Sequence, residues 1–95
     1  MATAVDIGTL ITKRPEMHSG RPCIAGTGTT VLAIVALYEQ GFGPQGIHEQ
    51  FPQLSLAGIL AALTYWAANP EEIEGYFRED HEAHDEWLAE VLAKR

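Results

Sequence analysis

The sequence predicts a mainly α-helical fold: a three-helix, helix-turn-helix core, preceded by a short β element and followed by an additional amphipathic helix. Glycine and proline interrupt the first 28 residues, and three apolar helical patterns separated by short turns come next. A long acidic pattern of helical period then begins at Pro70. We therefore divide the chain into a β and loop segment at 1–28, a helix-turn-helix core at 29–69 and an acidic helix at 70–95.

The N-terminal segment predicts two short strands. The pieces "LIT" and "CIA" are β-capable and lie on either side of a "HSGRP" turn, so they form a small hairpin or two isolated strands. The glycines of "SGRPCIAGTGTTV" allow positive φ, and the backbone can bend sharply there before the first helix. The stretch departs from both phosphate-binding patterns, because Ala25 and Val31 stand where glycines are required.

Three helices are predicted next, at 31–40, 44–51 and 56–68. Thr29 or Thr30 caps the first helix and Gly41 ends it, Pro44 opens the second, and Ser55 caps the third. Their predicted apolar faces are, in order, Val31, Ile34, Val35 and Tyr38; Ile47 and Phe51; and Leu56, Ile59, Leu60, Leu63 and Trp66 or Ala67. The short connections are typical of a helix-turn-helix unit, a layout that many modules without DNA binding share.

The last helix is predicted from about Pro70 to Ala93, with Asn69 placed to cap it. Its apolar strip consists of Ile73, Tyr76, Phe77, His84, Trp87, Leu88, Val91 and Leu92. So small a protein has little core left for this strip to cover. We therefore expect the strip to complete a dimer or to bind another protein, with contacts from Tyr76, Phe77, Trp87, Leu88 and Val91.

The net charge of −7 is unevenly distributed along the chain. Residues 1–30 hold three basic and two acidic side chains, whereas residues 71–95 hold nine acidic and three basic ones. A general nucleic-acid binder would be basic, since phosphate neutralisation supplies most non-specific affinity. Any DNA contact is therefore assigned to Lys13, Arg14 and Arg21, and the alternative is that these three are solvated surface charges.

No catalytic site, metal or cofactor is assigned. Cys23 as a nucleophile would need a nearby base and a lowered pKa, and its neighbours Pro22 and Ile24 favour a small buried residue instead. His81 and His84 have a spacing that can bind metal, but nothing specifies further ligands. The acids of the last helix's first turn, among them Glu72, are interpreted as partners of the helix dipole.

The stretch from Ile11 to about Ala68 resembles the domain of unknown function 433 family. The matching positions are Gly20, Arg21, Pro22, Ile24, Gly26, Thr27, Val31, Gly41, Pro44, Ile47, Phe51, Pro52, Leu54, Ser55, Ala62, Leu63 and Tyr65. The resemblance implies a helical fold with a helix-turn-helix core, a short N-terminal β element and a homodimer. Some relatives are antitoxins, which repress their own operon and mask a ribonuclease toxin.

The resemblance therefore implies a non-enzymatic antitoxin or transcriptional regulator. Its operator DNA would be contacted by Lys13, Arg14, Arg21 and Thr27, and a toxin by the acidic last helix. Gly28 stands where the family has an arginine suited to phosphate or guanine, so the alternative is a protein-interaction module without DNA binding.

The predicted location is the cytoplasm. No apolar run approaches the roughly 20 residues that span a bilayer, and the first residues lack the pattern of a signal peptide. A single cysteine cannot form an internal disulfide, which fits a reducing compartment. We expect no membrane contact and no small-molecule substrate.

Overall fold

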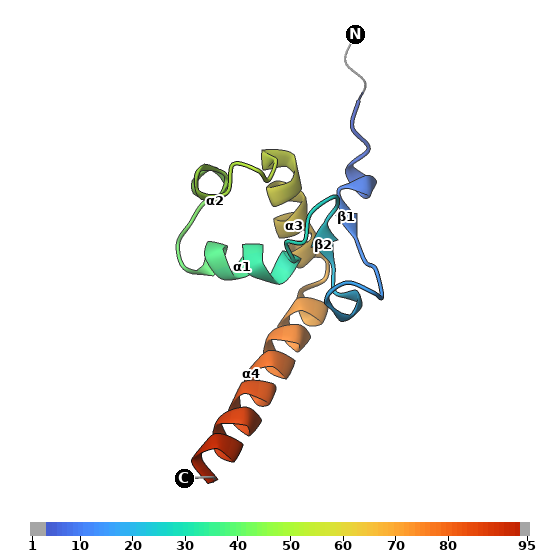
Figure 1. Cartoon of the computed structure of the whole chain (residues 1–95). Helices are drawn as coiled ribbons and strands as arrows, with labels where there is room; N and C mark the ends of the chain where they lie inside the picture. The colour runs from blue at the N-terminus through green and yellow to red at the C-terminus, as the bar shows by residue number, and fades with distance from the viewer. Residues whose placement is uncertain (1–3, 94–95) are drawn as a thin grey trace.

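The computed structural model describes residues 4–93, except for the side chains of 83–88, and it has the predicted mainly helical fold (Figure 1). A two-stranded antiparallel sheet, β1 (Ile11–Thr12) and β2 (Cys23–Ile24), precedes the helices. The helices are α1 (Val31–Glu39), α2 (Pro44–Gln50), α3 (Leu56–Ala68) and α4 (Pro70–Ala93). The molecule measures 64 × 29 × 23 Å, because α4 extends far beyond the other elements.

The two N-terminal strands pair as a hairpin, which confirms the first of the two predicted alternatives, a hairpin or two isolated strands. Ile11 pairs with Ile24 and Thr12 with Cys23, and the chain between them turns at His18–Gly20, where all three residues have positive φ. After β2 the chain folds back on itself at Gly26, whose φ is +77°. The stretch that the glycines bend therefore leads directly into α1.

Local capping defines the helix ends where the sequence predicts them. The Thr30 hydroxyl, not that of Thr29, accepts a hydrogen bond from the Ala33 amide at 3.2 Å, and Ser55 caps α3 in the same way. Gly41 follows α1 with a φ of +103°, a conformation that favours glycine. Asn69 directly precedes α4, as predicted, and its carbonyl accepts from the Ile73 amide at 3.3 Å. Its side-chain amide, however, donates to the Tyr65 carbonyl and so caps the end of α3.

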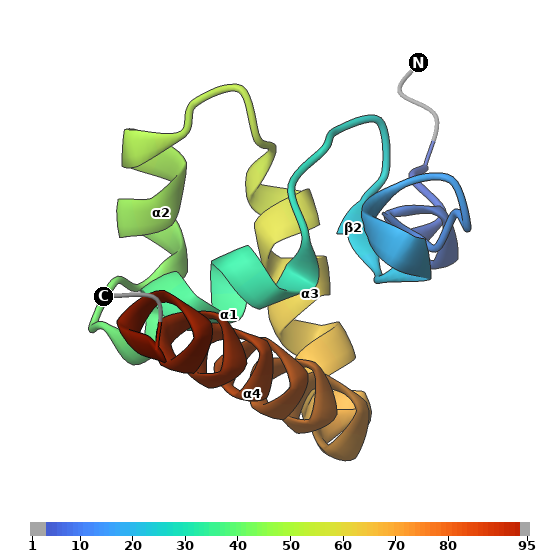
Figure 2. The same cartoon turned by 60° about the horizontal axis from the view of Figure 1, so that its bottom comes forward.

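The core lies where α1, α2 and α3 meet the hairpin and the beginning of α4 (Figure 2). Its fully buried side chains include Val31, Ile34, Val35, Ile47, Leu54, Ile59 and Ile73. Two positions of the predicted apolar faces are wrong, since Tyr38 is 43% and Leu60 is 45% exposed. Both α1 and α3 are apolar around most of their circumference, so helical periodicity alone could not select the buried face.

Among the described side chains of α4, those that belong to this core lie near the beginning of the helix. Ile73 is completely buried, and Tyr76 and Phe77 pack against the core as partly buried side chains. Farther along, Val91 is 40% and Leu92 51% exposed. In the part of the chain that the structure describes, no helix combines the length and apolar character needed to cross a membrane.

Candidate functional site

Arg21 joins the hairpin segment to α4. Its guanidinium faces Asp80 with two contacts, 2.9 Å from Nη2 to Oδ1 and 3.0 Å from Nη1 to Oδ2, and donates to Glu79 Oε2 at 3.3 Å. The same guanidinium lies 4.8 Å from the centre of the Tyr76 ring, a cation–π contact. These hydrogen bonds lower the pKa of Asp80 and raise that of Arg21, so both groups keep their charges at neutral pH.

Glu72 accepts three hydrogen bonds from side chains of the loop after β1, of α3 and of α4 itself. The donors are Lys13 Nζ at 2.8 Å, the Tyr65 hydroxyl at 2.7 Å and the Tyr76 hydroxyl at 2.6 Å. Partial burial alone would raise the pKa of Glu72, but the three donors together lower it. The Glu72 carboxylate in turn raises the pKa of Lys13 to about 12. Glu72 is therefore more than a partner of the helix dipole: it connects α4 to the residue after β1 and to α3.

We call the surface formed by Lys13, Arg21, Glu72, Glu79 and Asp80 the hairpin–α4 interface. In the pairs Lys13–Glu72 and Arg21–Asp80 the two partners are 59 positions apart in the sequence. Helical periodicity gives no information on contacts between residues so far apart. Sequence reasoning missed Glu72, Glu79 and Asp80 as members of this interface. The opposite charges of the first and last segments were the one signal that could have indicated the pairing.

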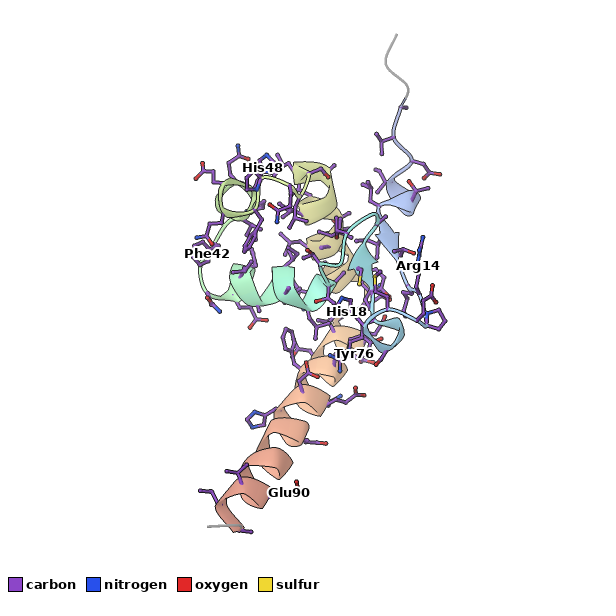
Figure 3. All side chains as sticks on the ribbon, viewed as in Figure 1. Arg14, His18, Phe42, His48, Tyr76 and Glu90 are labelled. Atoms are coloured by element: carbon purple, nitrogen blue, oxygen red, sulfur yellow. The ribbon has the colours of Figure 1, made fainter. Side chains whose placement is uncertain are left out.

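Three of the four residues predicted to contact DNA are engaged in other contacts. Lys13 and Arg21 are paired with carboxylates of α4, as described above. The Thr27 hydroxyl donates to the Ile24 carbonyl at 2.8 Å and accepts from the Thr29 amide at 3.1 Å, so its hydrogen bonds stabilise the turn after β2. Arg14 is exposed and lies on the outer side of the hairpin, away from α1 (Figure 3).

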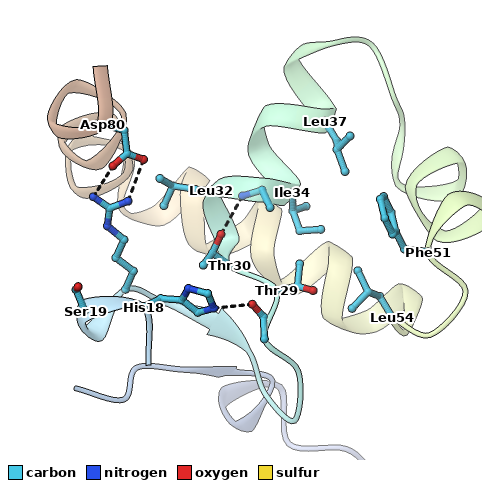
Figure 4. A pocket seen from close by; sticks show the side chains of 13 residues that line it. His18, Ser19, Thr29, Thr30, Leu32, Ile34, Leu37, Phe51, Leu54 and Asp80 are labelled. Carbon is cyan, nitrogen blue, oxygen red and sulfur yellow. Dashed lines mark hydrogen bonds and ion pairs between the residues drawn. The ribbon is translucent and has the colours of Figure 1, made fainter. Parts of the chain in front are cut away.

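A groove of about 740 Å³ lies between α1, the turn after α2 and the loop that leads into α1 (Figure 4). Its apolar lining includes Leu32, Leu37, Phe51 and Leu54, and its polar edge includes His18, Arg21, Thr29 and Asp80. The His18 ring nitrogen Nε2 is 2.8 Å from the Gly28 carbonyl oxygen. A smaller hollow of about 490 Å³, largely apolar, lies between the N-terminal segment and α3 near Ile7, Ile11 and Tyr65.

Cys23 has the environment of a structural residue. Its side chain is 2% exposed, and the thiol donates weakly to the Arg21 carbonyl at 3.5 Å. Burial raises the pKa of the thiol, which is the opposite of what a nucleophilic cysteine requires. Among the side chains that the structure describes, no three His, Cys, Asp or Glu residues come together as metal ligands, and His84 lies outside that description.

The residues predicted to bind a partner are divided between the two halves of α4. Tyr76 and Phe77 pack against the core, and the Tyr76 hydroxyl is bonded to Glu72. Val91 and its neighbour Leu92 are exposed on the half of α4 that leaves the body of the molecule. The side chains of Trp87 and Leu88 lie outside the described residues.

Fold and site together define a small helical domain in which an N-terminal hairpin is joined to the last helix by ion pairs. Residues 11–66 match the family described as "Protein of unknown function (DUF433)", and the chain belongs to this family, as its resemblance predicts. The chain is similar to the crystal structure of a DUF433 member protein from Anabaena variabilis ATCC 29413. The TM-score is 0.66 and the identity 28%, over 72% of this chain and 67% of that chain. A search of curated proteins finds no match.

Proposed function

We propose that this protein is a non-enzymatic protein-interaction module whose partner binds the distal half of α4. The observation that carries the proposal is the exposure of Val91 and Leu92 on a helix that projects away from the core. An apolar helix face of this kind is suited to the groove of a partner protein. Because residues 81–95, beyond the carboxylates paired with Lys13 and Arg21, hold four acids against two basic residues, the partner is expected to be basic, as a ribonuclease toxin would be.

The attachment of α4 supports this role. Ile73 is completely buried, and Tyr76 and Phe77 pack against the core as well. The distal half is therefore presented on a helix whose direction is determined by the core. A binding helix that is already formed and oriented loses less conformational entropy on association than a disordered segment does.

The test uses the purified full chain and, as the probe, the product of the gene adjacent to its own. The double substitution Val91→Asp/Leu92→Asp should weaken binding at least about tenfold in calorimetry, because it places charges in the apolar contact. Ala83→Asp/Ala93→Asp is the matched control: it adds the same two charges to the same half of α4, at helix positions about 80° or more away from both Val91 and Leu92. Equal losses for both variants would contradict a contact through Val91 and Leu92.

A second candidate function is a DNA-binding antitoxin or transcriptional regulator that acts as a homodimer. The order and short connections of α1, α2 and α3 favour it, since they correspond to a helix-turn-helix unit with α3 in the place of the recognition helix. Against it, α3 contains no Arg, Lys, Asn or Gln, the residue types that most often read bases.

This second function predicts that the chain binds its own upstream DNA with a steep dependence on salt. The triple substitution Lys13→Ala/Arg14→Ala/Arg21→Ala should then abolish the binding, and light scattering should give the mass of a dimer. If the upstream DNA is not bound at low salt while the neighbouring protein is, the protein-interaction module is the better description.

A further inference from the structure

One face of α4 is complementary to the basic hairpin segment. Glu72, Glu79 and Asp80 are separated by seven and eight positions, a spacing that places them on one side of a helix. Tyr76 lies between them, with its hydroxyl bonded to Glu72 and its ring under the Arg21 guanidinium. This acidic face meets Lys13 and Arg21, which flank the hairpin turn that also carries Arg14.

Arg21 binds the Asp80 carboxylate through a two-pronged contact that a phosphate group could also accept. A guanidinium with two parallel N–H bonds binds a carboxylate or a phosphate in the same way, and here Asp80 occupies that fork at 2.9 and 3.0 Å. An ammonium group such as that of Lys13 is likewise a general phosphate contact, and Glu72 accepts from it at 2.8 Å. A phosphate that approached either cation would also meet three negative carboxylates nearby.

We propose that the carboxylates Glu72, Glu79 and Asp80 of α4 block an intrinsic nucleic-acid-binding surface formed by Lys13, Arg14 and Arg21. The carboxylates occupy the two paired cations in place of phosphate, so the hairpin–α4 interface is an autoinhibitory contact. This inference is independent of the protein partner proposed at Val91 and Leu92, which lies at the other end of α4.

The basic surface formed by Lys13, Arg14 and Arg21 can be exposed by substitutions that leave α4 in place. Ile73 is completely buried and anchors the helix by apolar contacts. The side chains of Glu79 and Asp80 are 67% and 56% exposed, and ion pairs of such exposure contribute little to stability. Neutral substitutions at the three carboxylates should therefore release the cations while the helix stays in place.

The experiment compares two variants of equal net charge, −4 in place of −7. Glu72→Gln/Glu79→Gln/Asp80→Asn removes the carboxylates of the interface. Glu71→Gln/Glu74→Gln/Glu82→Gln removes three exposed carboxylates on other sides of the same helix. The probe is a short fluorescent DNA duplex of arbitrary sequence, and its anisotropy is titrated with each full-length variant at several salt concentrations.

The interface variant should bind the duplex at least about tenfold more tightly than the control. Its log affinity should fall with log salt at a slope of about −2 to −3, as expected for two or three phosphate contacts. Adding Lys13→Ala/Arg14→Ala/Arg21→Ala to it should remove the gain. Equal binding by the two charge-matched variants, or no gain for either, would overturn the proposal.

A milder variant keeps the test decisive if the triple substitution unfolds the chain. Glu79→Gln/Asp80→Asn releases Arg21 and leaves the three hydrogen bonds of Glu72 intact. Circular dichroism establishes that it is folded. It should bind the duplex more tightly than Glu71→Gln/Glu74→Gln, its control of equal charge, and the absence of that difference in a folded protein would again overturn the proposal.

Discussion

The substitution Ile73→Ala tests whether α4 is part of the core or only follows it in the sequence. Ile73 is completely buried and belongs to the same cluster as Val31, Ile34 and Ile59. The change removes three carbons at about 0.8 kcal/mol each, and the space left behind adds a further cost because neighbouring side chains relax only partly. We therefore expect the free energy of unfolding to fall by about 3 to 4 kcal/mol.

The loss would be a large share of the total stability, since small domains unfold at a cost of only about 5 to 15 kcal/mol. The assay is urea denaturation of the full chain followed by circular dichroism, with the slope m compared between variants. Leu60→Ala is the matched control, because Leu60 is 45% exposed on α3 and should lose less than about 1 kcal/mol. If Ile73→Ala lost no more than Leu60→Ala, the assignment of α4 to the core would be refuted.

Two further predictions follow from packing and from ionisation. A Cβ at Gly58 would lie 2.8 Å from Ile24 Cγ2, so Gly58→Ala should destabilise by about 1 kcal/mol despite its better helix propensity. Gly75→Ala, whose Cβ would meet only Arg78 Nη2 at 3.6 Å, should stabilise the protein by about 0.5 to 1 kcal/mol. If urea denaturation showed that both substitutions raise, or both lower, the free energy of unfolding, the packing described here would be contradicted. The pKa of Glu72 is lowered from 4.5 in the folded state, so its contribution is present above that pH and is lost as the pH falls. The stability gap between the native chain and Glu72→Gln should therefore narrow below about pH 4.5, and a gap that is constant from neutral pH to pH 3 would contradict the pairing.

The helices could be predicted from the sequence because their ends depend on local interactions. Thr30 and Ser55 each cap a helix through an amide three residues later, and Gly41 supplies a positive φ at the position where α1 must end. The hairpin could be predicted only as one of two alternatives. Its register, Ile11 with Ile24, depends on packing against α3, and no local pattern specifies that contact.

The buried faces were harder to predict than the helices themselves. In α3 the buried residues include Gly58, Ala61 and Ala62, whereas the larger Leu60 is exposed. The small residues face inward because β2 approaches the helix closely, as the contact between Gly58 and Ile24 indicates. Apolar character alone predicts that the larger Leu60 is buried. The short distance between α3 and β2 leaves room only for small side chains on the buried face.

The distribution of charge shows how a sequence pattern can be correct while its spatial interpretation is incomplete. Basic residues near the start and acidic residues near the end predict two charged extremities. In the fold, Glu72, Glu79 and Asp80 instead face Lys13 and Arg21, so much of the basic charge is neutralised at the beginning of α4. The distal half of the helix keeps Glu82 and Glu90 exposed, and Glu90 directly precedes the exposed Val91 and Leu92.

This separation bears directly on the choice of partner. The intramolecular ion pairs reduce the positive charge that DNA would require, and the negative charge left on distal α4 lies next to its exposed apolar residues. A basic protein would therefore be attracted to the same end of the molecule on which it could bury Val91 and Leu92. The distal acids matter for this attraction, so Glu82→Gln/Glu90→Gln should slow association with the neighbouring gene product more than it speeds dissociation. Stopped-flow kinetics at low and high salt measures both rates. A loss of affinity that came only from faster dissociation, with the association rate unchanged, would argue against electrostatic attraction at this end of α4.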